Sequence, residues 1–222
     1  MKVAVLYSGG KDSNLALYKA VKEGLKVKCL ITLTPINKDS YMFQSSNVFI
    51  TEYQAKALNL PLIKRETEGK KEEELKDLFL ALKEAKEKFN IEGVVSGALF
   101  STYQNERIQK IADKLDLWVF SPLWLLDQEK ELKELLNLNF EVIISKVSAW
   151  PLNINHVGKR LSEVFDFLVK NKKYLNVAGE GGEYETIVLN QPLFKRRLKI
   201  NFEKIKYSEN EAEIKIKNIE FE

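Results

Sequence analysis

The sequence predicts an α/β protein with a doubly wound, mainly parallel sheet, followed by a smaller α+β lobe that ends in antiparallel strands. From residue 2 to about residue 122, short apolar runs alternate with longer segments whose apolar residues recur every three to four positions, which is the pattern of alternating strands and helices. After residue 179, polar and apolar residues alternate one by one, as in antiparallel strands with one exposed face. We therefore expect two domains, residues 1–124 and 125–222.

The first domain should contain strands that are short apolar runs bounded by turn residues. We place them at residues 2–7, 26–33, 61–67, 92–97 and 117–120. Helices fill the intervals, at residues 12–23, 51–59, 72–89 and 101–115. The third helix is the clearest, because Leu75, Leu78 and Leu82 fall on one stripe with lysine and glutamate opposite. Gly24 suits the position just past the first helix, and residues 34–47 have the composition of a polar loop.

The second domain should begin by continuing the rhythm of helix and strand, with a helix at residues 128–136, a strand at 140–147 and a helix at 158–169. Alternation with period two then marks strands at residues 186–189, 197–206 and 212–221. The turn at residues 208–210 should join the last two strands into a hairpin.

Composition bounds the function. Hydrophobic residues make up 45% and charged residues 30%, which is typical of a globular protein, and no apolar run reaches the ~20 residues of a membrane helix. An apolar strand follows Met1 and Lys2 with no cleavage-site pattern, so we expect no signal peptide, no membrane partner and a cytoplasmic location. Cys29 is the single cysteine and His156 the single histidine, so neither a disulfide nor a zinc site is expected. The 35 basic and 32 acidic residues are interspersed, so we expect no direct binding of nucleic acid.

The first motif lies where a doubly wound sheet binds phosphate, between the first strand and the first helix. Its residues are Ser8, Gly9, Gly10, Lys11, Asp12 and Ser13. The glycines lack β-carbons, so their amides can approach phosphate oxygens, and the helix N-terminus favours the same anion. The serine hydroxyls can donate hydrogen bonds, Lys11 adds a compact positive charge, and Asp12 can cap the helix or help hold Mg²⁺. A tight turn capped by Asp12 is the alternative. Neither a Walker loop nor a dinucleotide fingerprint is present.

This S-G-G-K-D-S motif resembles the PP-loop of the N-type ATP pyrophosphatases, a group that includes GMP and argininosuccinate synthetases and the tRNA thiolation enzymes. The resemblance implies a fold like that of the adenine nucleotide alpha hydrolases, with residues 1–124 as the ATP-binding domain. It also implies cleavage of ATP between the α and β phosphates, with Gly97 and Ala98 beside the ribose and α-phosphate. Close packing of helix on strand is the alternative role for Gly97 and Ala98.

The second motif is an acidic, glycine-rich segment at residues 176–189, N-V-A-G-E-G-G-E-Y-E-T-I-V-L. The carboxylates of Glu180, Glu183 and Glu185 would repel one another unless they surround a cation or a substrate. Composition alone favours an exposed acidic turn before a strand.

Several segments together resemble the diphthine–ammonia ligase family. They are residues 179–186 (G-E-G-G-E-Y-E-T), 39–43 (D-S-Y-M-F), 96–99 (S-G-A-L), 103–108 (Y-Q-N-E-R-I), 122–124 (P-L-W) and 192–194 (P-L-F). The resemblance implies amidation of diphthine, the modified histidine of translation elongation factor 2, by ammonium and ATP. An acyl-adenylate is formed on the way, and diphthamide, AMP and pyrophosphate are the products. Residues 125–222 would then bind the substrate.

This chemistry assigns roles to individual residues. Lys11 and Mg²⁺ would stabilise charge on the leaving pyrophosphate, and Glu183 or Glu185 would take a proton from ammonium, because only neutral ammonia is nucleophilic. Glu180 would help bind the substrate.

Diphthine also carries a trimethylammonium group, which proteins hold with aromatic faces and nearby acids. We expect Tyr184, with Trp124, Tyr103 or Trp150, to line that pocket. Core packing is the alternative for each ring.

Two other functions remain open. The same loop occurs in tRNA-modifying enzymes of the thiolation or lysidine type, although thiolation usually needs more cysteine than Cys29 provides. A non-catalytic adenine-nucleotide sensor would bind ATP without turnover. No glutamine-hydrolysing motif is evident, so free ammonium is the expected nitrogen source. The sequence assigns no role to Glu74, Asp77 or His156, and it is compatible with a homo-oligomer.

Overall fold

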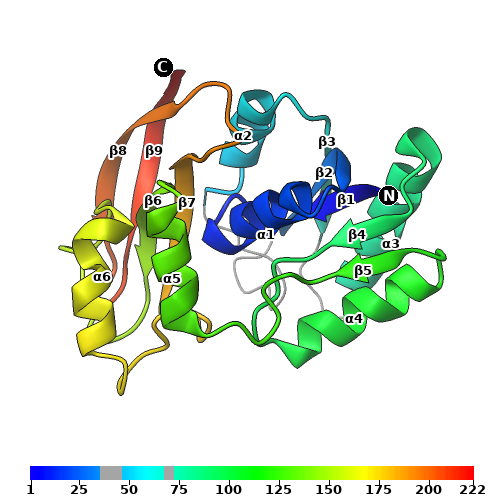
Figure 1. Cartoon of the computed structure of the whole chain (residues 1–222). Coiled ribbons are helices and arrows are strands. Elements are labelled where there is room, and N and C mark those ends of the chain that lie inside the picture. Colours follow the sequence, from blue (N-terminus) through cyan, green and yellow to red (C-terminus); the bar gives the residue numbers. More distant parts are fainter. Residues whose placement is uncertain (36–46, 68–72) are drawn as a thin grey trace. The chain divides into compact units, whose positions relative to one another are not determined.

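The computed structural model describes residues 1–35, 47–67 and 73–222 and divides into two compact units (Figure 1). The first unit comprises Met1–Ser8 and Asp12–Trp124. The second comprises Leu125–Glu222 together with the tripeptide Gly9–Lys11. Within the described residues, no helix is both long and apolar enough to cross a membrane.

The first unit is built on a five-stranded parallel sheet in the order β3-β2-β1-β4-β5. Its strands are β1 (Lys2–Leu6), β2 (Lys26–Pro35), β3 (Leu62–Thr67), β4 (Gly93–Val95) and β5 (Trp118–Phe120). The chain runs outward from β1 to β3 and then crosses back to β4, so the direction of winding reverses between β1 and β4. In open sheets of this kind, ligands bind beyond the carboxyl ends of the two strands that flank the reversal.

The helices of this unit lie between successive strands, as the period of the apolar residues predicts. They are α1 (Lys11–Lys22), α2 (Ile50–Leu58), α3 (Glu73–Phe89) and α4 (Thr102–Asp113). Helices α3 and α4 pack together on one face of the sheet, where Leu78, Leu82 and Ile108 share a core with Cys29 and Ile31. The predicted α/β class with a parallel sheet is confirmed.

The second unit is built on a four-stranded antiparallel sheet in the order β7-β6-β9-β8. Its strands are β6 (Glu141–Val147), β7 (Tyr184–Asn190), β8 (Leu198–Lys206) and β9 (Ala212–Phe221), and its helices are α5 (Gln128–Asn137) and α6 (Leu161–Lys170). Helix α5 begins at Asp127, whose carboxylate accepts a hydrogen bond from the Lys130 amide at 2.9 Å. The predicted hairpin of the last two strands is confirmed.

The sheet partners of one strand and the end of another differ from the expectation. Strand β6 joins the antiparallel sheet between β7 and β9 and does not continue the parallel rhythm. Its consecutive residues Val142–Ser145 are all buried, so a central antiparallel strand has the same apolar run as a parallel one. Strand β2 continues into the expected loop because Thr34 and Pro35 still pair with β3. The motif at residues 39–43 lies outside the described residues.

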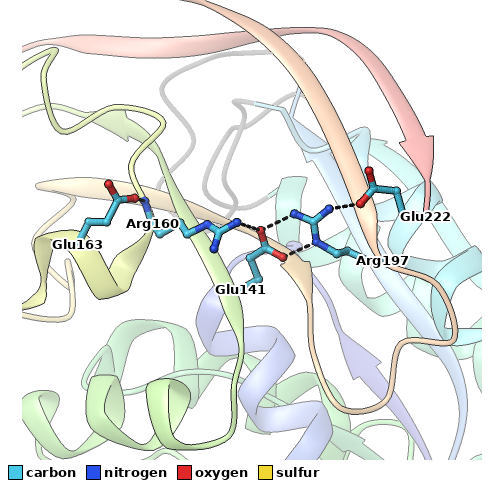
Figure 2. A network of polar contacts seen from close by, with 5 residues as sticks. All are labelled: Glu141, Arg160, Glu163, Arg197 and Glu222. Carbon is cyan, nitrogen blue, oxygen red and sulfur yellow. Dashed lines mark hydrogen bonds and ion pairs between the residues drawn. The ribbon is translucent and has the colours of Figure 1, made fainter.

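A group of charged side chains ties the ends of the second unit's elements together (Figure 2). The carboxylate of Glu141, at the start of β6, accepts two hydrogen bonds from the Arg197 guanidinium, at 2.6 and 2.7 Å. It also forms an ion pair with Arg160 at 3.0 Å, and Arg197 reaches Glu222 as well. Bonding to Glu141 raises the pKa of Arg197 further above its ordinary value. Because two guanidinium groups converge on one carboxylate, this pairing fixes the start of β6 against β8 and α6.

Candidate functional site

Tyr7, which precedes the glycine loop, is held by hydrogen bonds to β2 and α1. The Tyr7 amide donates to the Ile31 carbonyl at 2.8 Å, and the Thr32 hydroxyl donates to the Tyr7 carbonyl at 2.6 Å. The buried Tyr7 hydroxyl donates to Asn14 Oδ1 at 2.7 Å, and burial raises the pKa of this phenol, so the hydroxyl keeps its proton. Gly9 then turns with a φ of 85°, in the region that favours glycine.

The loop closes on the first turn of α1 and against the end of β4. The hydroxyls of Ser8 and Ser13 lie 3.3 Å apart and form a hydrogen bond. A β-carbon at Gly97 would lie 3.0 Å from both the Asp12 carbonyl carbon and the Ser13 amide nitrogen. Gly97 therefore allows the close approach of helix to strand, and Ala98 beside it is also buried. Nucleotide contacts of Gly97 and Ala98 stay predictions.

The tripeptide Gly9–Lys11 contacts the second unit, to which it belongs. The Val188 amide donates to the Gly9 carbonyl at 3.2 Å, and the Lys11 amide donates to the Thr186 hydroxyl at 3.1 Å. Both partners lie on β7. The structure therefore brings the end of the acidic motif to the glycine loop, although 175 positions separate Lys11 from Thr186.

The side chain of Lys11 is buried and paired with an acid that sequence reasoning missed. Lys11 Nζ lies 3.2 Å from Glu131 Oε1, and the two side chains are 2% and 0% exposed. Glu131 lies in α5 beside the buried Leu132 and near the buried Leu135. An acid on the apolar stripe of a helix was the signal that could have identified Glu131.

The acidic segment is folded around the carboxylate of Glu183. This carboxylate accepts hydrogen bonds from the Asn176 amide at 2.8 Å, from Asn176 Nδ2 at 2.7 Å and from the Gly181 amide at 2.8 Å. A β-carbon at Gly181 would lie 2.7 Å from Glu183 Oε1, so a side chain there would displace the Glu183 carboxylate from these hydrogen bonds. Glu183 thus closes the loop that carries the exposed Glu180.

Glu185 has a different environment, because charged residues of the next two strands of the sheet, β6 and β9, lie near it. It pairs in register with Lys146 of β6, which pairs on its other side with Glu213 of β9. Burial raises the pKa of Glu185 to about 7, while Lys146 opposes the rise and Glu213 adds to it. Among the described residues, Glu185 Oε2 is buried and has no hydrogen-bond partner. Glu185 can therefore gain or lose a proton near neutral pH.

The expected aromatic residues fall in different surroundings. Tyr184 is only 4% exposed, and its hydroxyl donates to the Val177 carbonyl at 2.6 Å. Tyr103 has the Arg107 guanidinium 3.4 Å from its ring centre and lies in the first unit, as does Trp124. Trp150 is 58% exposed and meets Tyr174 edge to face, with ring centres 4.9 Å apart. Among these candidates, Trp150 offers the most accessible ring.

The single cysteine and the single histidine lie outside both motifs. Cys29 is buried, and burial, with a smaller contribution from the charge of Glu84, raises the pKa of its thiol to about 12. His156 Nδ1 accepts a hydrogen bond from the Asn153 amide, and burial lowers the pKa of the imidazole. The described residues contain no cluster of three or more histidine, cysteine or acidic side chains arranged to hold a metal. Mg²⁺ is often held by one carboxylate together with substrate phosphates, and Mg²⁺ binding by Asp12 stays a prediction.

Comparison with known proteins gives a consistent result along the chain. Residues 1–118 match the model of the diphthamide synthase N-terminal domain, and residues 127–220 match that of the diphthamide synthase C-terminal domain. The chain is 38% identical to the diphthine–ammonia ligase of Rattus norvegicus over 222 residues, which covers 90% of this chain and 83% of the rat protein.

More distant relatives bear the same name. Identity is 36% to the diphthine–ammonia ligase of Homo sapiens, over 89% of this chain and 82% of the human protein. It is 30% to that of Saccharomyces cerevisiae, over 98% of this chain and 37% of the longer yeast protein. Both halves of the chain, with the glycine loop in one and the acidic segment in the other, thus belong to the diphthamide synthase family.

Proposed function

We propose that this chain is a diphthine–ammonia ligase, which amidates diphthine on translation elongation factor 2 with ATP and ammonium. The names of its curated relatives support this function. The observation that carries it is the hydrogen bond from the Lys11 amide to the Thr186 hydroxyl. This bond joins the phosphate-binding loop to β7, the strand that also carries Glu185, so residues of both motifs belong to one unit.

The reaction proceeds in two displacements. An oxygen of the diphthine carboxylate attacks the α-phosphorus of ATP, and the bond from that phosphorus to the leaving pyrophosphate breaks. The nitrogen of ammonia then attacks the acyl carbon, the bond from that carbon to the AMP oxygen breaks, and the nitrogen releases one proton to solvent to give the neutral amide. Lys11 and the amides of Gly9 and Gly10 stabilise negative charge on the phosphates. Mg²⁺, when bound, supplies further positive charge, and Asp12 is the residue proposed to hold it.

Glu185 is our choice for the base that takes the proton from ammonium. The three hydrogen bonds to Glu183 give that carboxylate a structural task, whereas Glu185 Oε2 has no such partner among the described residues. A base whose pKa is about 7 is well matched to proton transfer near neutral pH.

Trp150 is our choice for the main ring that contacts the trimethylammonium group, with Tyr184, Tyr103 and Trp124 as the other candidates. The turn that carries Trp150 adjoins the acidic segment, since the Ser148 amide donates to the Glu183 carbonyl at 2.8 Å. An exposed aromatic face on a turn that adjoins the acidic segment suits a cation that has no hydrogen-bond donors.

Mass spectrometry of the modified histidine tests this function. Diphthine-bearing elongation factor is incubated with the chain, ATP, Mg²⁺ and isotopically labelled ammonium. The expected result is conversion of the carboxylate to a labelled amide, with one AMP and one pyrophosphate for each amide. Reactions lacking ATP or ammonium are the controls. Tight ATP binding without turnover would instead support a nucleotide sensor, and modification of tRNA would support a tRNA-modifying enzyme.

A further inference from the structure

The buried ion pair between Lys11 and Glu131 has a consequence for how the glycine loop binds anions. Lys11 is the only charged residue of the tripeptide Gly9–Lys11, and its ammonium lies 3.2 Å from Glu131 Oε1. Neither side chain is appreciably exposed. A buried ammonium requires an anionic partner, because the cost of removing it from water is large. Glu131 fulfils that requirement in the described structure.

The position of Glu131 is fixed by its helix. The Glu131 amide donates to the Asp127 carbonyl at 2.9 Å, in the first turn of α5. Leu132 and Leu135 are fully buried on the same helix. The carboxylate therefore cannot retreat to solvent without unpacking α5 from the unit, and Lys11 is the more adaptable member of the pair because an ammonium has three donors on a long stem.

We infer that Glu131 is the resident counter-ion of Lys11, and that the polyphosphate of ATP competes with it for the ammonium. This inference rests on the proposed function only in taking Lys11 as a phosphate ligand. Glu131 is then a positioning residue: it holds the Lys11 ammonium in place when no ligand is bound. Polyphosphate must displace this pairing in order to bind, so the pairing lowers the affinity for polyphosphate. Release of product pyrophosphate is favoured for the same reason, since Glu131 takes the ammonium back.

The variant Glu131→Gln tests this role, because it keeps the shape of the side chain and removes its charge. Without ligand, its melting temperature should fall by roughly 5–10 °C, since the buried ammonium loses the negative charge of Glu131. Addition of the α,β-methylene analogue of ATP should raise the melting temperature more in Glu131→Gln than in the wild type. The dissociation constant of the analogue, measured by calorimetry, should be about tenfold lower for Glu131→Gln than for the wild type, because the competing carboxylate charge has been removed.

A matched control is available on the same helix. Glu129 pairs with Lys133 at 2.7 Å and is partly exposed, so Glu129→Gln should change neither the melting temperature nor the response to the analogue appreciably. The double variant Lys11→Met/Glu131→Met removes both charges and keeps apolar volume. It should melt above Glu131→Gln and should lose most of the response to the analogue, which gives a readout even if Glu131→Gln folds poorly.

Equal stabilisation of the wild type and Glu131→Gln by the analogue would overturn the inference, because the ion pair would then be purely structural while ATP binding itself stands. An analogue that stabilises neither protein would overturn the inference and the ATP half of the proposed function together. Tighter binding by Glu131→Gln, with the response lost in the double variant, would support the inference independently of any amidation assay.

Discussion

Replacement of Glu185 by glutamine is expected to change the pH dependence of stability in a defined direction. Burial raises the pKa of Glu185 from its ordinary value of 4.5 to about 7 in the folded chain. Below pH 4.5 the carboxyl is protonated in both folded and unfolded chains, so burial costs the wild type nothing through ionisation. As the pH rises from 4.5 to about 7, the unfolded chain loses this proton and the folded chain retains it, so the wild type loses stability across that interval. Glutamine does not titrate, so the Glu185→Gln variant does not lose stability in this way.

The magnitude follows from the pKa difference. A pKa difference of one corresponds to about 1.4 kcal/mol, so the rise from 4.5 to about 7 corresponds to a loss of about 3 kcal/mol above neutral pH. The buried Oε2 lacks a partner among the described residues in the wild type, and an amide nitrogen placed there would share that cost. Comparison of each protein with itself at two pH values removes this second effect.

Urea unfolding at about pH 4.5 and about pH 8.5 measures the effect. The difference in unfolding free energy between Glu185→Gln and the wild type should increase by about 3 kcal/mol in favour of the variant as the pH rises. Glu220→Gln is the control, because Glu220 is an exposed acid on β9, and its difference from the wild type should stay constant. If the curves for Glu185→Gln and the wild type run parallel with pH, the carboxyl is ordinary and its assignment as the base loses its physical support.

Four further results are expected. The amidation rate of the wild type should rise through about pH 7 as Glu185 loses its proton, and Glu185→Gln should lower that rate by roughly 10²–10⁴-fold in a quenched assay of AMP release. Gly97→Ala places a β-carbon 3.0 Å from the Ser13 amide, so unfolding in urea should show a loss of about 1–3 kcal/mol. Glu141→Gln weakens the pairing with Arg197 and should lower the unfolding free energy by about 1–3 kcal/mol, as measured by the same method. Cys29→Ala should leave amidation unchanged in the mass-spectrometric assay, since a buried thiol takes no part in the proposed reaction; loss of activity without loss of fold would point back to sulfur chemistry.

The sequence was sufficient for the order of the elements because strands and helices here have distinct periods. The stripe on α3 and the alternation on β8 and β9 each require only local information. The strands that pair with β6 could not be predicted from local pattern, since a buried central strand has the same composition in a parallel and in an antiparallel sheet.

The residues of the candidate site were predicted only in part, because some of their roles depend on tertiary contacts. The S-G-G-K-D-S loop can be recognised from its residue types and from its position between the first strand and the first helix. The different environments of Glu183 and Glu185 depend on the groups that surround each carboxylate in the folded chain. The hydrogen bonds from Asn176 and Gly181 to Glu183 could not be inferred from the spacing of the residues. Glu131 escaped notice because an acid on a helix is ordinarily exposed, and only burial by tertiary packing reveals its pairing with Lys11.

The position of Gly9–Lys11 within the second unit also bears on how the chain folds during synthesis. Lys11 leaves the ribosome early, while Glu131 follows 120 positions later and Thr186 later still. The first sheet can form beforehand, but its glycine loop acquires these contacts only when most of the chain is available. A fragment beginning at Leu125 would lack Lys11 and would bury the Glu131 charge without that counter-ion, so the second unit should not fold as a separate module.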